Sequence, residues 1–231
     1  MNRILSFILF LTLISCQEPG SRQGHSDNSS LDSIEDQETS ESGDEQDTGD
    51  REYWQKPELV IDKLGDLNNK TVADLGSGIG YFSFKLLPKA EKVIAIDVDT
   101  IKINILKNFK NSYASDLKNK LDIRLVSPSN PKLKAQEVDL ILIVNTVPYI
   151  TSRISYFENL KETLKPGGEI VIVDFKTKRI PDYVNAPPYS SREYLHVLED
   201  ELIEAGYDVT ETDDTSLEYQ FMIFASPVEG K

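Results

Sequence analysis

The feature that most constrains the fold is a glycine-rich loop that follows a short apolar run. The sequence there reads Val72-Ala73-Asp74-Leu75-Gly76-Ser77-Gly78-Ile79-Gly80-Tyr81-Phe82. Gly76 and Gly78 permit a sharp turn with positive φ and let a ligand lie against bare backbone, and Gly80 lets a helix start close to the sheet. The pattern therefore predicts a strand, a tight ligand-binding turn and a helix.

Further apolar runs alternate with helical stretches, which predicts an α/β fold: Rossmann-like, doubly wound, with a mostly parallel seven-stranded sheet. Only Thr212 to Gln220 separates the last two strands, too short a link for a crossover helix, so we expect an antiparallel last strand at one sheet edge. The predicted strands are Thr71 to Leu75, Lys92 to Ile96, Asp122 to Val126, Val138 to Asn145, Glu169 to Phe175, Asp208 to Glu211 and Phe221 to Ala225. The predicted helices are Pro57 to Gly65, Tyr81 to Leu87, Thr100 to Asn111, Ser152 to Leu164 and Ser191 to Ala205.

An acidic residue is predicted at the end of the second strand. Asp97 directly follows that strand and lies seventeen residues after Gly80. An acid in this place can accept hydrogen bonds from both ribose hydroxyls of a nucleoside. NAD-binding domains share the feature, so it indicates a nucleoside ligand without choosing among them. Val98 would lie beside the adenine, and Asp99 is expected to cap the following helix.

The loop resembles motif I of class I S-adenosylmethionine-dependent methyltransferases, because it reads G-x-G-x-G with Asp74 two residues before the first glycine. A dinucleotide loop usually has its third glycine one position later, where this chain has Tyr81. The stretches Val138 to Asn145 and Leu164 to Phe175, the second opening with Leu-Lys-Pro-Gly-Gly, resemble the fourth and fifth strands of the same family. In the family, the acid at the Asp74 position helps hold the ammonium group of the cofactor, although the same acid could instead cap the next helix. The resemblance implies S-adenosylmethionine as the cofactor, held by Asp74, Gly76, Ser77, Gly78, Gly80, Asp97 and Val98.

The residues that would meet a methyl acceptor are less clearly marked, and the catalytic residues are unknown. Asn145 and Tyr149, just after the fourth strand, are the candidates for acceptor contact, although the Asn-Pro-Pro-Tyr signature of amino-methylating enzymes is absent. The stretch Arg51 to Pro57 resembles the lead-in of a group of small, poorly characterised methyltransferases, so Trp54 is either a lid over the cofactor or a surface-packed aromatic. His196 is interpreted as a surface or packing residue, and no Cys/His metal cluster is expected.

The N-terminal residues have a different character. Residues 1–15 read as a signal peptide, with an apolar stretch too short to span a bilayer as a mature anchor. Leu13-Ile14-Ser15-Cys16 resembles the lipobox of bacterial lipoproteins, which implies a lipid on Cys16, and the alternative is an ordinary signal peptide. Residues 17–50 hold eleven acids and one base, so residues 16–50 are predicted to be a disordered acidic tether, and residues 51–231 the methyltransferase-like domain.

These interpretations lead to two hypotheses about function. The first is a methyltransferase tethered to a membrane of the bacterial cell envelope, facing away from the cytoplasm and acting on a small molecule or an envelope component. The second is a non-catalytic binding module with the same fold, because S-adenosylmethionine is made in the cytoplasm and would be scarce outside it. Residues 51–231 hold 28 acids and 23 bases, so no nucleic-acid partner is expected. A nicotinamide-dependent oxidoreductase is disfavoured by the glycine spacing.

Overall fold

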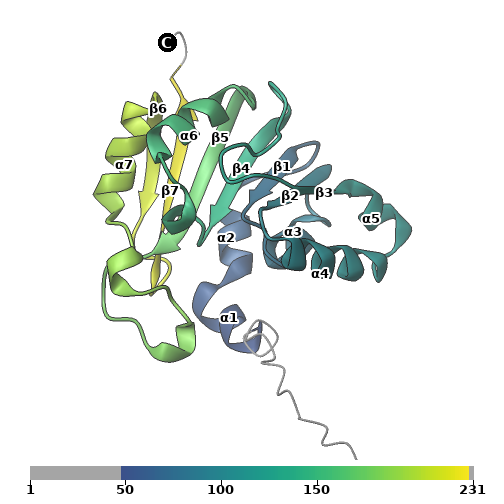
Figure 1. Cartoon of the computed structure of the whole chain (residues 1–231), viewed down its shortest axis with the longest axis horizontal. Helices are drawn as coiled ribbons and strands as arrows, with labels where there is room; N and C mark the ends of the chain where they lie inside the picture. Colours follow the sequence, from purple (N-terminus) through teal and green to yellow (C-terminus); the bar gives the residue numbers. More distant parts are fainter. Residues whose placement is uncertain (1–47, 229–231) are drawn as a thin grey trace, which may run out of the picture. The chain divides into compact units, whose positions relative to one another are not determined.

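The computed structural model describes residues 48–228, which form a seven-stranded sheet with helices on both faces (Figure 1). The strands lie in the order β3-β2-β1-β4-β5-β7-β6. Strands β1 to β5 are parallel to one another, and β7 is antiparallel to both β5 and β6. The predicted fold and the antiparallel final pair are therefore confirmed. The strands are β1 (Thr71–Leu75), β2 (Lys92–Asp97), β3 (Leu121–Leu125), β4 (Val138–Val144), β5 (Leu164–Phe175), β6 (Tyr207–Asp213) and β7 (Gln220–Pro227).

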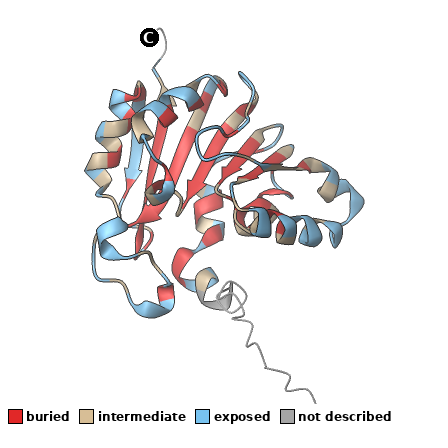
Figure 2. Ribbon diagram, in the orientation of Figure 1, coloured by how far each residue is buried: buried red, intermediate tan, exposed pale blue. Residues whose placement is uncertain are grey.

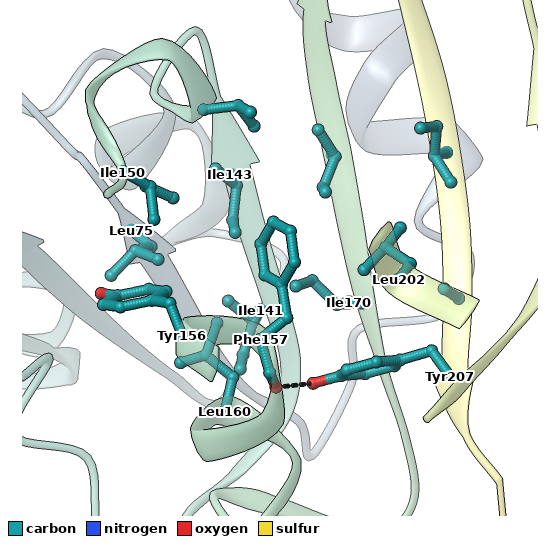
Figure 3. Packing of buried hydrophobic residues seen from close by; sticks show 14 of the residues in the cluster. Leu75, Ile141, Ile143, Ile150, Tyr156, Phe157, Leu160, Ile170, Leu202 and Tyr207 are labelled. Atoms are coloured by element: carbon teal, nitrogen blue, oxygen red, sulfur yellow. Dashed lines mark hydrogen bonds between the residues drawn. The ribbon is translucent and has the colours of Figure 1, made fainter. Parts of the chain in front are cut away.

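The central strands are apolar along their length because both faces of the sheet are covered (Figure 2). In β4, Ile141 and Ile143 join the cluster under α6 and α7, and Leu140 and Leu142 join the opposite cluster under α2, α3 and α4. Within the first cluster, the Tyr207 hydroxyl donates to a backbone carbonyl of α6 at 3.0 Å (Figure 3). The helices are α1 (Thr48–Gln55), α2 (Pro57–Lys63), α3 (Tyr81–Leu86), α4 (Thr100–Asn111), α5 (Ser115–Lys120), α6 (Arg153–Lys161) and α7 (Leu195–Glu204), with 3₁₀ turns η1 (Val147–Tyr149), η2 (Asp182–Val184) and η3 (Tyr189–Ser191).

Several predicted boundaries differ from the structure. The helix expected over Ser152 to Leu164 ends at Lys161, and Lys165 to Gly168 belong to β5 instead of ending a helix. They form an irregularity at which the pairing of β4 with β5 shifts. The helix expected from Ser191 begins only at Leu195, after η3. Helix α5 was not predicted from the sequence. It buries no residue, so it lacks the amphipathic pattern by which a helix is recognised.

The structure also bears on the N-terminal boundary. Helix α1 begins at Thr48, before the predicted end of the tether at Asp50. The predicted signal peptide, Cys16 and the remainder of the predicted tether lie outside the described residues. In the part of the chain from 48 to 228, no helix has the length and apolar character needed to cross a membrane.

The carboxyl ends of three strands meet at one edge of the sheet. Leu75 of β1 pairs with Ile96 of β2 and with Ile143 of β4, so the residues that follow these three leave the sheet at the same level. After β1 the chain continues toward one edge of the sheet, because β2 lies next to β1 on the side away from β4. After β4 it continues toward the opposite edge, because β5 lies next to β4 on the side away from β1. In open α/β sheets such a switch point opens a crevice that binds ligands.

Candidate functional site

A cavity of about 700 Å³ lies at this switch point. One half is lined by the glycine loop after β1, the end of β2 and the start of α4. The other half is lined by α1, the segment after β4, the end of β5 and the loop between η2 and η3. Its size is within the range of small-molecule and cofactor sites.

The glycine loop has the geometry that its sequence predicts. Gly76, Gly78 and Gly80 have φ values of +81°, +55° and +97°. A Cβ atom on Gly76 would lie 2.1 Å from the Thr146 hydroxyl oxygen, whereas one on Gly78 would meet nothing within 4 Å. The Gly76 and Ser77 amides donate to the Ile96 carbonyl at 2.8 and 3.0 Å, which fixes the turn against β2. Open space at Gly78 leaves room for a ligand against the backbone.

Asp97 holds this loop from the neighbouring strand. Its Oδ2 accepts a hydrogen bond from the Gly78 amide at 2.7 Å, and its Oδ1 accepts one from the Asp99 amide at 2.8 Å. Asp99 caps α4 by accepting from two backbone amides of its first turn, as predicted. Each carboxylate oxygen can accept two hydrogen bonds, so Asp97 keeps capacity for ribose hydroxyls. Val98 follows on the cavity wall with 52% of its surface exposed.

Asp74 is a buried carboxyl on the same wall. It is only 2% exposed, and it accepts a hydrogen bond from the Ser83 hydroxyl at 2.6 Å. Burial raises its pKa to about 6, although the Ser83 hydrogen bond and the positive charge of Arg51 oppose the rise. This bond joins two side chains and does not cap α3, whose N-cap is Gly80, and it leaves the other carboxylate oxygen for a ligand. A buried carboxyl gains most from a cationic partner such as an ammonium group.

Helix α1 supplies one cationic and one aromatic side chain to the cavity wall. The Arg51 guanidinium lies 4.2 Å from the centre of the Tyr81 ring, a cation–π contact with the residue that follows the glycine loop. Trp54 is 4% exposed and packs on Phe175 of β5, with 5.7 Å between ring centres. Trp54 is therefore a buried wall of the cavity, and its interpretation as a surface-packed aromatic is wrong.

Two buried polar atoms on this wall have no hydrogen-bond partner among the described residues: the Trp54 indole nitrogen and the Ser77 hydroxyl. Both residues line the cavity. Buried donors are seldom left unpaired, so such atoms fit a site that is completed by a polar ligand or by water. The donors and acids around the glycine loop thus fit a nucleoside with an amino-acid tail.

The segment after β4 brings both acceptor candidates to the cavity. Asn145 has a φ of +54°, its amide donates to the Val173 carbonyl at 2.9 Å, and its side-chain oxygen accepts a hydrogen bond from Gln220 of β7. Tyr149, in η1, is 72% exposed and lies at the rim. His196 is exposed on α7 and is not among the residues that line the cavity.

Sequence reasoning missed Tyr156, Gln220 and Arg51. Tyr156 is 8% exposed and lines the cavity from α6, and burial raises its pKa to about 12. A tyrosine on the buried face of a helix is more often part of the core, so the sequence contains no signal for it. For Arg51 the sequence did contain a signal. It lies three residues before Trp54, and residues three apart share a helix face, so a helix that brings Trp54 to the cavity also brings Arg51 there.

A second buried carboxyl, Asp174 of β5, was also passed over, and it stands behind the cavity without lining it. Burial raises its pKa to about 7, while backbone amides of Phe175 and Val147 donate to it at 2.7 and 3.2 Å. No three His, Cys, Asp or Glu side chains between residues 48 and 228 are grouped so that they could share a metal ion.

The comparisons with known proteins agree with this geometry. A family model described as a methyltransferase domain matches residues 66–217. The chain is 28% identical over 141 residues to ribosomal RNA small subunit methyltransferase A of Bacillus licheniformis, covering 58% of this chain and 45% of that protein. It is 31% identical over 127 residues to the tRNA U34 carboxymethyltransferase of Shewanella sediminis, covering 54% of this chain and 37% of that protein. The chain thus spans less than half the length of these curated relatives.

Solved structures show the same fold at low sequence identity. A SAM-dependent methyltransferase from Aquifex aeolicus superposes with a TM-score of 0.72 at 23% identity, over 80% of this chain and 96% of that one. The glycopeptide N-methyltransferase MtfA, solved with S-adenosylmethionine, superposes with a TM-score of 0.61 at 13% identity, over 74% of this chain and 87% of that one.

Proposed function

The chain belongs to the methyltransferase-domain family, and from this premise we propose that it is an S-adenosylmethionine-dependent methyltransferase, tethered to a membrane through Cys16. The observation that carries the enzymatic part is the convergence of the three-glycine turn, Asp74 and Asp97 on one cavity. The open space at Gly78 and the unpaired Ser77 hydroxyl support a ligand that lies along the loop.

Each cofactor-binding residue has a distinct task in this proposal. Asp74 accepts the ammonium group of the amino-acid tail, because a buried carboxylate is stabilised by a cation. Asp97 accepts the ribose hydroxyls while it continues to hold the Gly78 amide. Val98 packs beside the adenine, and Gly76, Ser77 and Gly78 keep the backbone close to the ligand. Gly80 is not among the lining residues; a Cβ there would lie 2.8 Å from the Phe84 ring, so this glycine lets α3 start close to its neighbours.

The protein contributes mainly by holding its two substrates together. When bound, S-adenosylmethionine supplies an electrophilic methyl group on a positively charged sulfur. Fixing a nucleophile in line with such a group lowers the barrier by about 7 to 11 kcal/mol through proximity and orientation. Trp54 and Phe175 exclude water from the side of the cavity where Asn145 and Tyr149 contact the acceptor.

The acceptor in this proposal is a small molecule or a component of the cell envelope. The curated relatives are named for ribosomal RNA and tRNA, but the domain from residue 51 onward holds more acids than bases, 28 against 23. Proteins that bind nucleic acid usually carry a basic patch or stripe, so a nucleic-acid acceptor is disfavoured.

Membrane tethering rests on the sequence. The lipobox-like Leu13 to Cys16 segment provides one thiol, which is the single cysteine of the chain. Acyl chains on that residue would hold the protein at a membrane of the bacterial envelope, because each buried methylene adds about 0.8 kcal/mol. In the alternative proposal the same tether displays a non-catalytic methyltransferase-fold binding module, since the cofactor is scarce outside the cytoplasm.

Calorimetric titration of S-adenosylhomocysteine into the full chain, purified in detergent, tests the enzymatic part. We expect micromolar binding that weakens at least tenfold in Asp97→Asn, because the variant loses a charged acceptor for the ribose hydroxyls. Asp116→Asn removes the same charge from the exposed first turn of α5, away from the residues that line the cavity, so it serves as the matched control. Absence of binding by the folded protein would leave the binding-module alternative.

A further inference from the structure

The charged groups of the cavity are distributed unevenly between its two halves. Among the described residues, the carboxylates that line it are Asp74, Asp97 and Asp99, all on the side of the glycine loop and the end of β2. Arg51 of α1 also lines the cavity, but its guanidinium stacks on Tyr81 beside the glycine loop, so we count it with that side. We define the acceptor half by its lining residues: Trp54, Asn145, Thr146, Tyr149, Ile150, Tyr156, Phe175 and Val184 to Pro188. Within the range 48–228 this half contains no Asp, Glu, His, Lys or Cys. It therefore offers no carboxylate, imidazole, amine or thiolate as a general base, and no anionic partner for an amine.

Asn145 presents a hydrogen-bond donor to the acceptor half. Its side-chain carbonyl oxygen accepts from the Gln220 amide, so the group that remains for a ligand is its own NH₂. Gln220 is fully buried and pairs across the sheet with Phe175, which itself packs on Trp54. The backbone amide of Asn145 is bonded to Val173, which fixes the position of the residue.

Tyr156 presents a second donor. Its ring lies beside Leu75 and below Ile150, and its hydroxyl points away from the rest of the apolar cluster (Figure 3). Because burial raises the pKa of Tyr156 to about 12, the hydroxyl stays protonated at neutral pH and can donate. Asp174, the nearby buried carboxyl, does not line the cavity, and its oxygens accept backbone amides instead.

The rest of the acceptor half is apolar. Trp54, Phe175 and Val184 belong to one buried cluster, and Ile150 closes the wall beside Tyr156. An apolar body would gain by leaving water for such a wall, whereas a highly charged one would lose its hydration.

We propose that the methyl acceptor is an apolar carboxylic acid, which the protein converts to its methyl ester. This inference rests on the proposed methyltransferase function and names its substrate class. A carboxylic acid with a pKa near that of Glu, about 4.3, is already ionised at neutral pH, whereas amines and phenols with pKa values of about 10 would have to lose a proton. The acceptor half lacks a base for those substrates and offers donors for a carboxylate.

The step balances without proton transfer. A lone pair on one carboxylate oxygen forms the new O–CH₃ bond while the S–CH₃ bond breaks, and its electron pair stays on sulfur. The carboxylate loses its negative charge and the sulfonium loses its positive charge, so a neutral ester and a neutral thioether result. The donors of Asn145 and Tyr156 hold the second carboxylate oxygen and orient the first.

The test begins with the full chain in detergent, saturated with S-adenosylhomocysteine. Three probes of the same shape are then titrated: cyclohexanecarboxylate, cyclohexanecarboxamide and cyclohexylmethylammonium. Binding is followed by calorimetry and by the fluorescence of Trp54, the single tryptophan of the chain. None of the three probes absorbs at the wavelengths that excite tryptophan or at which it emits. We expect the carboxylate to bind at least tenfold tighter than the other two.

Variants connect that preference to the structure. Asn145→Asp keeps the shape and the oxygen bonded to Gln220 but replaces the donor with an anion, so we expect it to abolish the preference for the carboxylate. Asn104→Asp makes the same charge change on the exposed side of α4 and should preserve the preference. With S-adenosylmethionine, mass spectrometry should detect the methyl ester, formed at a rate that changes less than twofold between pH 6.5 and 8.5.

The outcomes separate the two proposals. If S-adenosylhomocysteine does not bind, the methyltransferase proposal fails and this inference with it. If it binds but the ammonium or amide probe binds as tightly as the carboxylate, only the acceptor class is overturned. Unchanged carboxylate preference in Asn145→Asp, or a rate that rises steeply with pH, would also overturn it.

Discussion

The turn at Gly76 provides the sharpest test of the geometry of the site. Replacing Gly76 with Ala would place a Cβ 2.1 Å from the hydroxyl oxygen and 2.5 Å from the methyl carbon of Thr146. Thr146 cannot move freely, because its hydroxyl donates to the Val144 carbonyl at 2.9 Å. The variant also places a residue that has a Cβ at a backbone φ of +81°. Gly76→Ala therefore carries two penalties, one from the backbone and one from the contact.

Gly65 separates these penalties, because its φ is similar at +71° and a Cβ there would meet nothing within 4 Å. Gly65→Ala should lower the free energy of unfolding by about 1 to 2 kcal/mol, the cost of the left-handed conformation alone. Gly76→Ala should lower it by about 1 to 3 kcal/mol more, the usual cost of overpacking. The difference between the two variants measures the contact with Thr146.

Urea denaturation of the full chain gives these free energies of unfolding. The comparison requires equal m-values for all variants, because a changed m-value would indicate a change in the unfolded or native state. Thr146→Ala removes the two closest atoms and leaves its own Cβ 2.8 Å from the position that the Cβ of Ala at residue 76 would take, so it should relieve part of the penalty in the Gly76→Ala background. We expect a favourable coupling of about 1 kcal/mol in the double-mutant cycle. Equal losses for Gly65→Ala and Gly76→Ala, with no coupling to Thr146, would refute the close approach.

Three further predictions concern pH and the N-terminus. Burial raises the pKa values of Asp74 and Asp174 to about 6 and about 7, so above about pH 5 the folded state binds more protons than the unfolded state, and the free energy of unfolding should fall as pH rises from about 5 to 7. Glu137 and Asp213 have lowered pKa values and act in the opposite sense only below this range. Asp174→Asn should flatten the upper part of that decline in urea titrations, and a stability that instead increases over this range would contradict the reasoning. Affinity for S-adenosylhomocysteine should rise as pH increases through about 6, because the ammonium group needs the Asp74 carboxylate, and Asp74→Asn should remove this dependence in calorimetry. Cys16→Ser should release the protein from the membrane fraction, and mass spectrometry of the N-terminal peptide should find acyl chains only on the wild type.

The parts of the fold that could be predicted are those in which local pattern and tertiary context agree. The strand Thr71 to Leu75 and the helix Thr100 to Asn111 have the predicted bounds, because one is a short apolar run before a glycine and the other begins at an Asp cap. The irregular start of β5 could not be predicted, since a Pro-Gly-Gly sequence normally marks a turn. Its pairing depends on β4, which supplies the neighbouring backbone.

The cofactor side of the site could be predicted for a related reason. Its residues are adjacent in sequence, so spacing alone brings Asp74 and the glycines together, and Asp97 follows one strand later. The acceptor side is assembled from α1, η1, α6 and β7. Gln220 reaches Asn145 across 75 positions only because β7 pairs antiparallel with β5, a register that neither segment specifies by itself. The orientation of the Asn145 amide, on which the acceptor class depends, is therefore a property of the sheet.

Helix α1 also changes where the methyltransferase domain should be taken to begin. A boundary at Arg51, as the composition suggested, would cut the helix that supplies Arg51 and Trp54 to the cavity. Glu52 in this helix pairs with Lys85 of α3, and the Arg51 guanidinium stacks on Tyr81, so α1 is attached to the helix that follows the glycine loop. Removing the first turn of a helix leaves its remaining amides without their hydrogen-bonding context and favours fraying. Fragments that start at Arg51 should therefore bind S-adenosylhomocysteine more weakly than those that include all of α1, even though every predicted cofactor-binding residue is present in both.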